Sequence, residues 1–206
     1  MGTSEVVRLG ASAVPDIVDV YCDAFRDYPV MRFVLSDDGS YAERLPVLIH
    51  LFVAARAIRE EPLLGIVRND RLVAAATVSF PTDQAGPTEL EAVREATWRE
   101  LGAEARARYE ACGEVWKTFA MPERHTHLNM IGVRRSAQGQ GHARRLLDHV
   151  HGMSERSPGS EGVTLTTEAR ENVAFYQRAG YEIIGHARVS TDLETWGFFR
   201  RTTGGQ

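Results

Sequence analysis

The chain has 206 residues, of which 43% are apolar and 25% are charged, and its formal net charge is −4. This length and composition predict a globular protein with a sizeable core. The chain lacks a basic surplus, which argues against nucleic acid as a partner, and no apolar run is long enough to span a membrane. Residues 1–14 lack the pattern of a secretory signal, so we expect a cytoplasmic protein with two reduced cysteines, Cys22 and Cys112.

The N-terminal part of the chain predicts a short strand followed by two helices. The strand covers the segment SEVVRLG, residues 4–10. Apolar residues then recur at helical spacing over residues 14–25, where Ser12 is the expected N-cap and Pro15 lies in the first turn. The segment YAERLPVLIHLFVAARAI, residues 41–58, carries the second helical pattern.

The periodicity then changes from helical to extended and back again. Two short apolar runs over residues 63–80 flank an Asn-Asp pair at 69–70, which predicts a β-hairpin. Residues 88–119 read as one or two charged helices with breaks near Gly102 and Gly113. The apolar stripe of these helices is thin, so we expect them to pack on the surface or to cover a site.

The C-terminal part alternates strands with helices. This order predicts an α/β fold with a mixed sheet in a single domain over residues 1–206, with residues 88–125 as a helical insert. An exposed final strand could pair between two subunits, so we expect a monomer or a homodimer. The expected strands are 125–133, 163–167, 181–189 and 195–201, and the expected helices begin near Gln138 and cover 171–180.

The segment QGQGHA, residues 138–143, lies between a strand and a helix and has the composition of an anion-binding turn. Backbone N–H groups at a helix N-terminus attract anions, and residues without a large side chain let phosphate approach them closely. The segment lacks the Gly-Lys-Ser/Thr ending of a Walker loop and the glycine spacing of the dinucleotide fingerprint. A glycine-rich turn without a ligand is the alternative interpretation.

A second candidate site lies on the helix ENVAFYQRAG, where Asn172 and Tyr176 are four residues apart and therefore share one face. A polar pair in this position is suited to contact a ligand, while Phe175 and Ala179 pack inward. A tyrosine that only packs in the core is the alternative.

Together and in this order, the two segments resemble the GCN5-related N-acetyltransferase (GNAT) family. The resemblance is specific over about residues 126–186, and over residues 5–80 it rests on the order of elements. Within the family, DAFRDYPVMRFVL and the helical insert are most similar to small-molecule acetyltransferases of the puromycin-acetyltransferase kind. The resemblance implies a central mixed, mostly antiparallel sheet of six to seven strands flanked by helices. The matching motif residues are Gln138, Gly141 and Ala143 in the loop, followed by Asn172, Phe175, Tyr176, Gly180 and Tyr181.

The resemblance also implies a reaction, the transfer of acetyl from acetyl-coenzyme A to a primary amine. The loop N–H groups would hold the pyrophosphate, Val133 would contact the pantetheine arm, and Asn172 would bind pantetheine or order the loop. The arginines Arg134 and Arg135 would add positive charge near the phosphates, with solvated turn residues as the alternative. The full set of expected coenzyme A contacts is Val133, Arg134, Arg135, Gln138, Gly139, Gln140, Gly141, His142, Ala143, Asn172 and Tyr176.

The resemblance places the general acid at Tyr176 and leaves the general base open. A phenol near the sulfur can protonate the departing thiolate, whereas an ammonium acceptor must first lose a proton. The candidates for the base are His127 and Glu168. Close family members often have Glu where this chain has Thr166, which weakens the assignment by analogy. A strand histidine hydrogen-bonded to a neighbour is the more conservative interpretation of His127.

No metal is expected at the His125-x-His127 pair, because no third ligand follows at a recognisable spacing. The preferred hypothesis is an N-acetyltransferase that acts on a small-molecule amine by direct attack in a ternary complex. Two alternatives remain, namely a protein or peptide N-acetyltransferase and a non-catalytic sensor that binds coenzyme A.

Overall fold

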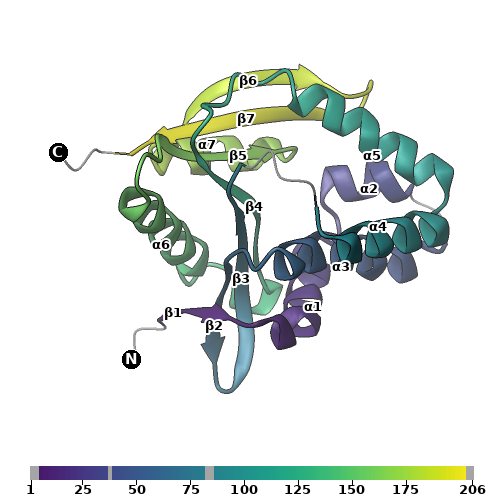
Figure 1. Cartoon of the computed structure of the whole chain (residues 1–206), viewed down its shortest axis with the longest axis horizontal. Coiled ribbons are helices and arrows are strands. Elements are labelled where there is room, and N and C mark those ends of the chain that lie inside the picture. The colour runs from purple at the N-terminus through teal and green to yellow at the C-terminus, as the bar shows by residue number, and fades with distance from the viewer. Residues whose placement is uncertain (1–4, 37–38, 82–85, 203–206) are drawn as a thin grey trace.

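The computed structural model of the chain describes residues 5–36, 39–81 and 86–202. Its strands form one seven-stranded sheet in the order β1-β2-β3-β4-β5-β7-β6 (Figure 1). Among the described strand pairs only β4 and β5 are parallel. The predicted mixed and mostly antiparallel sheet is therefore confirmed. The strands are β1 (Val6–Leu9), β2 (Leu63–Arg68), β3 (Arg71–Ser79), β4 (Thr126–Val133), β5 (Gly162–Thr167), β6 (Glu182–Arg188) and β7 (Glu194–Arg201).

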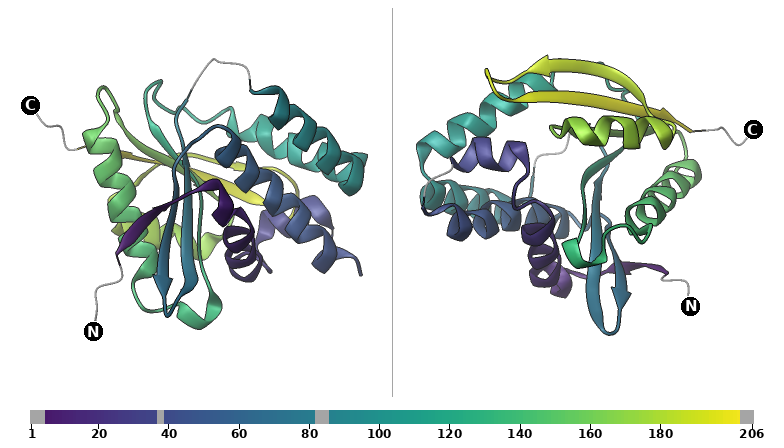
Figure 2. Two further views of the ribbon diagram at one scale, coloured as in Figure 1. Left: turned by 60° about the horizontal axis from the view of Figure 1, so that its bottom comes forward. Right: turned by 180° about the vertical axis from the view of Figure 1, so that it is seen from behind.

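Helices cover both faces of this sheet. The ribbon views show helices packed on both sides of the sheet (Figures 1 and 2). Side chains of α1 to α5 form one buried cluster with one face of the sheet, and those of α6 and α7 form another with the opposite face. None of the described helices is long and apolar enough to cross a membrane. The helices are α1 (Val14–Ala24), α2 (Pro29–Leu35), α3 (Tyr41–Ile58), α4 (Thr88–Leu101), α5 (Ala103–Trp116), α6 (His142–Arg156) and α7 (Arg170–Arg178), with 3-10 turns at η1 (Ala11–Ala13) and η2 (Arg135–Ala137).

Three details of the helices differ from the sequence prediction. The N-cap of α1 is Ala13, because Ser12 belongs to the preceding 3-10 turn. Helix α5 runs through Gly113, whereas Gly102, with φ of +86°, does separate α4 from α5. A glycine inside a helix costs only about 1 kcal/mol, which tertiary packing easily overrides. Helix α2 was not predicted, although Pro29 at its start is a favourable first helical residue.

The β2–β3 hairpin matches the prediction in place, with the Asn-Asp pair in its turn. Arg68 pairs with Arg71, which leaves Asn69 and Asp70 as the two residues of the loop. Both have positive φ, +49° and +57°, as a type I′ turn requires. Asn and Asp tolerate this region better than other non-glycine residues, which explains why this pair occupies the turn.

The final strand does not lie at an edge of the sheet, so the expectation of an exposed pairing strand is wrong. Strand β7 pairs with β5 on one side and with β6 on the other. In the hairpin of β6 and β7, it is β7 that lies next to β5. Phe198 of β7 stands opposite Leu165 of β5, and both side chains belong to the same buried cluster. The edges of the described sheet are β1 and β6.

The sheet opens between its two parallel strands. Only two residue pairs connect β4 to β5, Thr126 with Val163 and His127 with Thr164. Beyond this point β4 continues along β3, and its residue Asn129 forms a bulge in that pairing, between Leu128 and Met130. The strands therefore diverge towards the carboxyl end of β4, which creates the space in which the site lies.

Candidate active site

A cavity of about 630 Å³ lies next to the opening between β4 and β5. This volume is in the range that accommodates a small molecule. The three candidate catalytic residues, His127, Glu168 and Tyr176, all line it, as does Asn172. These residues come from β4, from the end of β5 and from α7, so the fold unites positions that are up to 49 residues apart in sequence. Helices α3, α4 and α5 supply much of the remaining wall.

Glu168 is the most perturbed acidic group of this cavity. Its side chain is only 8% exposed, and burial raises the pKa of the carboxyl to about 7. Hydrogen bonds oppose this rise in part, since Thr195 Oγ1 donates to Oε1 over 2.7 Å and Trp116 Nε1 donates to the same oxygen over 3.3 Å. A carboxyl with a pKa near neutrality can exchange protons at physiological pH, as a general base must.

The backbone around Glu168 is fixed by contacts with α2 and α7. The Glu168 N–H donates to the Tyr28 hydroxyl over 3.1 Å, and that hydroxyl is 2.7 Å from Thr167 Oγ1. Asn172 Nδ2 also donates to Thr167 Oγ1, over 3.3 Å. The contact of Asn172 therefore orders the β5–α7 connection.

His127 lines the same cavity as Glu168 but differs in its electrostatics. Its Nδ1 is 2.8 Å from Thr164 Oγ1 on the adjacent strand. Burial, together with the neighbouring His125, lowers the pKa of the His127 imidazole to about 4. The ring is therefore neutral at pH 7 and a weak base compared with Glu168, as expected for a strand histidine bonded to a neighbour.

Tyr176 is packed in the core and also lines the cavity. Its ring packs in the core against Phe198 and Tyr181, with ring centroids 5.5 and 5.8 Å away, and it is only 6% exposed. It nevertheless lines the cavity, and its hydroxyl has no hydrogen-bond partner among the described residues. Burial, together with the charge of Glu168, raises the pKa of the phenol, so the group is protonated and can act as a donor.

The loop between β4 and α6 has the geometry of an anion cradle. Gly139 and Gly141 have φ of +75° and +78°, and a Cβ added to either meets nothing within 4 Å. The backbone N–H groups of Gly139, Gln140 and Gly141 donate to no described backbone carbonyl. The first turn of α6, which begins at His142 and Ala143, adds further free N–H groups. These open, unpaired donors fit a pyrophosphate such as that of coenzyme A.

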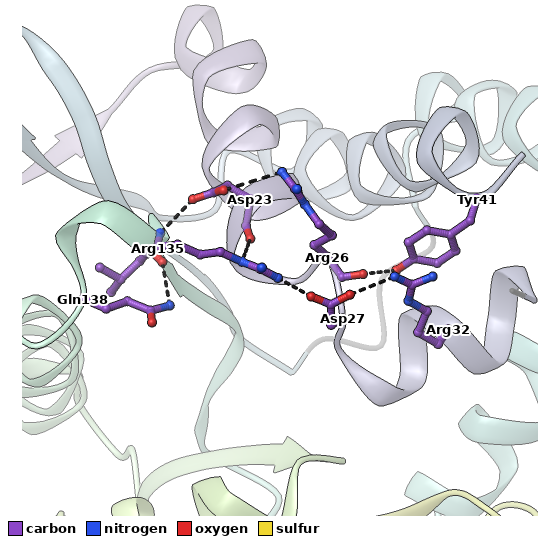
Figure 3. Close-up of polar contacts among 8 residues, drawn as sticks. Asp23, Arg26, Asp27, Arg32, Tyr41, Arg135 and Gln138 are labelled. Atoms are coloured by element: carbon purple, nitrogen blue, oxygen red, sulfur yellow. Dashed lines mark hydrogen bonds and ion pairs between the residues drawn. The ribbon is translucent and has the colours of Figure 1, made fainter. Parts of the chain in front are cut away.

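The two arginines before the loop are engaged with the protein. Arg134 is 6% exposed, and its guanidinium donates to Leu72 O over 2.8 Å and to Asp19 over 2.5 Å. The structure therefore does not bring Arg134 to the anion cradle. Arg135 donates to Asp27 and to the backbone oxygen of Asp23, as Figure 3 shows. It ties the loop to the end of α1, and half of its side chain stays accessible to solvent.

The predicted coenzyme A contacts Gln138 and His142 lie on different sides of the loop, one towards β4 and the other towards the β2–β3 hairpin. Gln138 is exposed, and its Nε2 donates to Val133 O over 3.3 Å, which closes the loop onto the end of β4 (Figure 3). His142 is buried, and neither ring nitrogen has a described partner. It lines a hollow on the side of the β2–β3 hairpin together with Gln140 and Ser136. The side chain of His142 therefore faces this hollow.

Two residues of the site were missed by the sequence analysis, Tyr28 and Trp116. Tyr28 is followed by Pro29, and this tyrosine-proline step before an apolar run could have revealed helix α2. Trp116 lies at the end of the insert, where no local pattern indicates that its indole reaches Glu168. Only the tertiary packing of α5, which contacts α2 and α4, brings the two together.

The residues that the structure describes also bear on metal binding and on thiol chemistry. No cluster of three or more His, Cys, Asp or Glu side chains suited to a metal occurs in residues 5–36, 39–81 and 86–202. Cys22 and Cys112 are free, and burial raises the pKa of their thiols to about 11 and about 12. Neither thiol is therefore activated as a nucleophile.

Comparisons with known proteins identify the family and the fold. The sequence profile of the acetyltransferase (GNAT) domain matches residues 92–195, half of the chain. No curated protein matches the chain at the level of sequence. Among solved structures, histone acetyltransferase HPA2 and related acetyltransferase from Corynebacterium glutamicum is 17% identical with a TM-score of 0.70, covering 98% of this chain and 97% of that chain.

Two further solved structures show the same fold at lower similarity. The ribosomal-protein-S18-alanine N-acetyltransferase from Escherichia coli is 12% identical with a TM-score of 0.54, over 98% of this chain and 96% of that chain. An agmatine N-acetyltransferase mutant is 16% identical with a TM-score of 0.58, over 95% and 97%. The family profile and the fold thus define an acyl-transferring enzyme. The chain belongs to the GNAT family of acetyltransferases, whose co-substrate is acetyl-coenzyme A and whose acceptors are amines.

Proposed function

We propose that the protein transfers acetyl from acetyl-coenzyme A to the primary amine of a small molecule, by direct attack within a ternary complex. The observation that carries this proposal is the position of Glu168. Its buried carboxyl, with a pKa near 7, lines the same cavity as the Tyr176 phenol. A base and an acid of this kind in one cavity meet the two proton requirements of amine acetylation.

In this proposal the loop, Glu168 and Tyr176 each have a separate task. The N–H groups from Gly139 to Ala143 hold the pyrophosphate, and acetyl-coenzyme A supplies the acetyl group as a thioester. Glu168 takes a proton from the acceptor ammonium, directly or through water. Tyr176 donates its hydroxyl proton to the departing sulfur.

The acceptor is proposed to be a small molecule because α4 and α5 cover the cavity. Trp98, Tyr109 and Trp116 of these helices line it, so the insert forms a wall of the pocket. Similar folds serve both substrate classes, since the names of the solved neighbours include a ribosomal-protein-alanine enzyme and an agmatine enzyme. A protein acceptor would need an extended groove, which this cover argues against.

The test is a thiol-release assay with acetyl-coenzyme A and a panel of small amines and peptides. We expect thiol release with small amines and little with peptides. A preference for peptides would favour the protein acetyltransferase. Tight binding of coenzyme A without thiol release from any amine would favour the non-catalytic sensor and would contradict the proposal.

A further inference from the structure

We propose that the acceptor amine is carried on an aromatic or similarly flat apolar body and has no second positive charge. This inference rests on the proposed function and names the substrate class of the same cavity. Two features of the cavity carry it, the aromatic composition of its walls and the distribution of charge along them.

The first wall is an aromatic cluster built by three helices, consisting of Phe52 from α3, Trp98 from α4, and Tyr109 and Trp116 from α5. Tyr109 lies at its centre, with ring centroids 5.4 Å from Phe52, 5.3 Å from Trp98 and 6.1 Å from Trp116. All four residues line the cavity. Such a wall offers flat apolar surface and ring edges, against which another ring packs well.

Further lining residues come from the connection of α1 to α2. Phe25 and Tyr28 stand edge to face, with ring centroids 5.1 Å apart. The apolar residues Val30, Met31 and Val34 of α2 extend this lining. Tyr28 also holds the Glu168 backbone, so this aromatic lining adjoins the carboxyl. An amine that reaches Glu168 therefore has its body against these rings.

Charge along the cavity restricts the acceptor further. Among the described lining residues Glu168 is the only acidic one, whereas Arg56, Arg94 and Lys117 are basic. The carboxylates paired with these three cations are Glu61, Glu91 and Glu114, and none of them lines the cavity. One ammonium group of an acceptor can therefore pair with Glu168. A second ammonium group would be repelled by the basic lining residues.

The experiment compares matched acceptors in the thiol-release assay with the full chain. The probes are 2-phenylethylamine, ethylamine, 2-[4-(aminomethyl)phenyl]ethylamine and a short peptide with a free N-terminus. We expect kcat/KM for 2-phenylethylamine to exceed that for each of the others by roughly tenfold or more. Burial of a ring is worth about that factor or above relative to ethylamine, the second ammonium of the diamine meets the basic residues of the cavity wall, and the peptide is too extended for the covered cavity.

Each other outcome has a defined meaning. If the diamine, ethylamine or the peptide equals 2-phenylethylamine, the substrate class is overturned, while thiol release with any amine upholds acetyl transfer. If no amine releases thiol, both the proposed function and this inference are overturned.

Two variants test the charge of the cavity and its aromatic wall separately. Arg94→Gln should raise the diamine-to-monoamine ratio of kcat/KM several-fold, whereas Arg99→Gln, an exposed arginine on the same helix outside the cavity lining, should leave it unchanged. Phe52→Leu should reduce the preference for 2-phenylethylamine over ethylamine several-fold and leave KM for acetyl-coenzyme A unchanged. Unaltered ratios in both Arg94→Gln and Phe52→Leu would overturn the inference.

Discussion

At the scale of single residues, the environment of Glu168 decides its chemistry. A glutamate in water is ionised at pH 7 and is a weak base, because its pKa lies near 4.3. Burial beside β5 raises the pKa of Glu168 to about 7, while the donors Thr195 and Trp116 keep the ionised form accessible. The same sequence position on an exposed strand end would have no such property.

The variant Glu168→Gln tests this role through the pH dependence of turnover. The base must be ionised, so kcat/KM of the wild type should rise with pH through about 7 and level off above it. The glutamine variant should lose roughly 10²–10⁴-fold in kcat and should also lose that rising limb. The control is Glu194→Gln, which changes a neighbouring carboxylate outside the cavity lining. A variant that keeps the limb at full rate would remove Glu168 from the role of base.

A second residue-scale variant, Tyr176→Phe, removes the hydroxyl and keeps the packed ring. We expect kcat to fall by roughly 10²-fold or more, because the loss of a general acid typically costs an enzyme this factor in rate. The Kd for coenzyme A should change little. Tyr181→Phe is the matched control, since Tyr181 is also buried and contacts the Tyr176 ring but does not line the cavity. Equal losses in turnover and in coenzyme A affinity would rule out the acid role.

At the scale of elements, the loop from β4 to α6 leaves its backbone N–H groups open to a ligand. Its two glycines occupy left-handed conformations with open space beside them, and η2 is fastened to α1 by Arg135. Exposed ion pairs of this kind are screened by solvent and add little to the stability of the fold. The attachment therefore positions the loop more than it stabilises the fold.

The loop is tested by Gly141→Glu, which places a carboxylate where the pyrophosphate is expected. Coenzyme A binding should be lost, with Kd raised by about 100-fold or more, because the side chain adds like charge and fills the cradle. Isothermal titration calorimetry measures this directly. Gly102→Glu is the matched control, since Gly102 has φ of +86° and equally open surroundings but lies between α4 and α5. Retained binding in Gly141→Glu would mean that the loop is only a turn.

At the scale of the whole molecule, the insert and the sheet form one site. Helix α5 carries Trp116 to Glu168 Oε1 and to Thr195 Oγ1, so a segment distant in sequence tunes the carboxyl on β5. The divergence of β4 from β5 leaves the room in which this contact and the cavity lie. The helix that covers the cavity therefore also affects the protonation of Glu168.

This coupling is tested by Trp116→Phe, which removes the indole donor and keeps an aromatic ring. A hydrogen bond to the ionised carboxylate lowers the pKa of Glu168, so its loss should move the midpoint of the kcat/KM rise to higher pH. We expect a shift of about half a unit to one unit. Trp98→Phe, a change in the same cavity wall without a donor to Glu168, should leave the midpoint in place. An unshifted midpoint in Trp116→Phe would exclude the positioning role.

The sequence predicted much of the fold because local signals and the global fold agree. The Asn69-Asp70 turn and Gly180, which ends α7 with Tyr181 N–H bonded to Tyr176 O, are examples of local chemistry that fixes an element. Helix α2 escaped prediction because seven residues carry too short a pattern. The place of β7 inside the sheet escaped it because strand order depends on long-range pairing.

By itself, the sequence determined the family and the sheet class, and it predicted which loop residues would hold a pyrophosphate, because these depend on spacing within short segments. The tertiary structure alone decided the electrostatics of the site. It separated Glu168 from His127 as the proposed base, and it committed Arg134 to Asp19 and Leu72. It also brought Tyr28 and Trp116 to the carboxyl. The physical reason is that pKa values and pocket walls depend on burial and on contacts between distant segments, which no local pattern records.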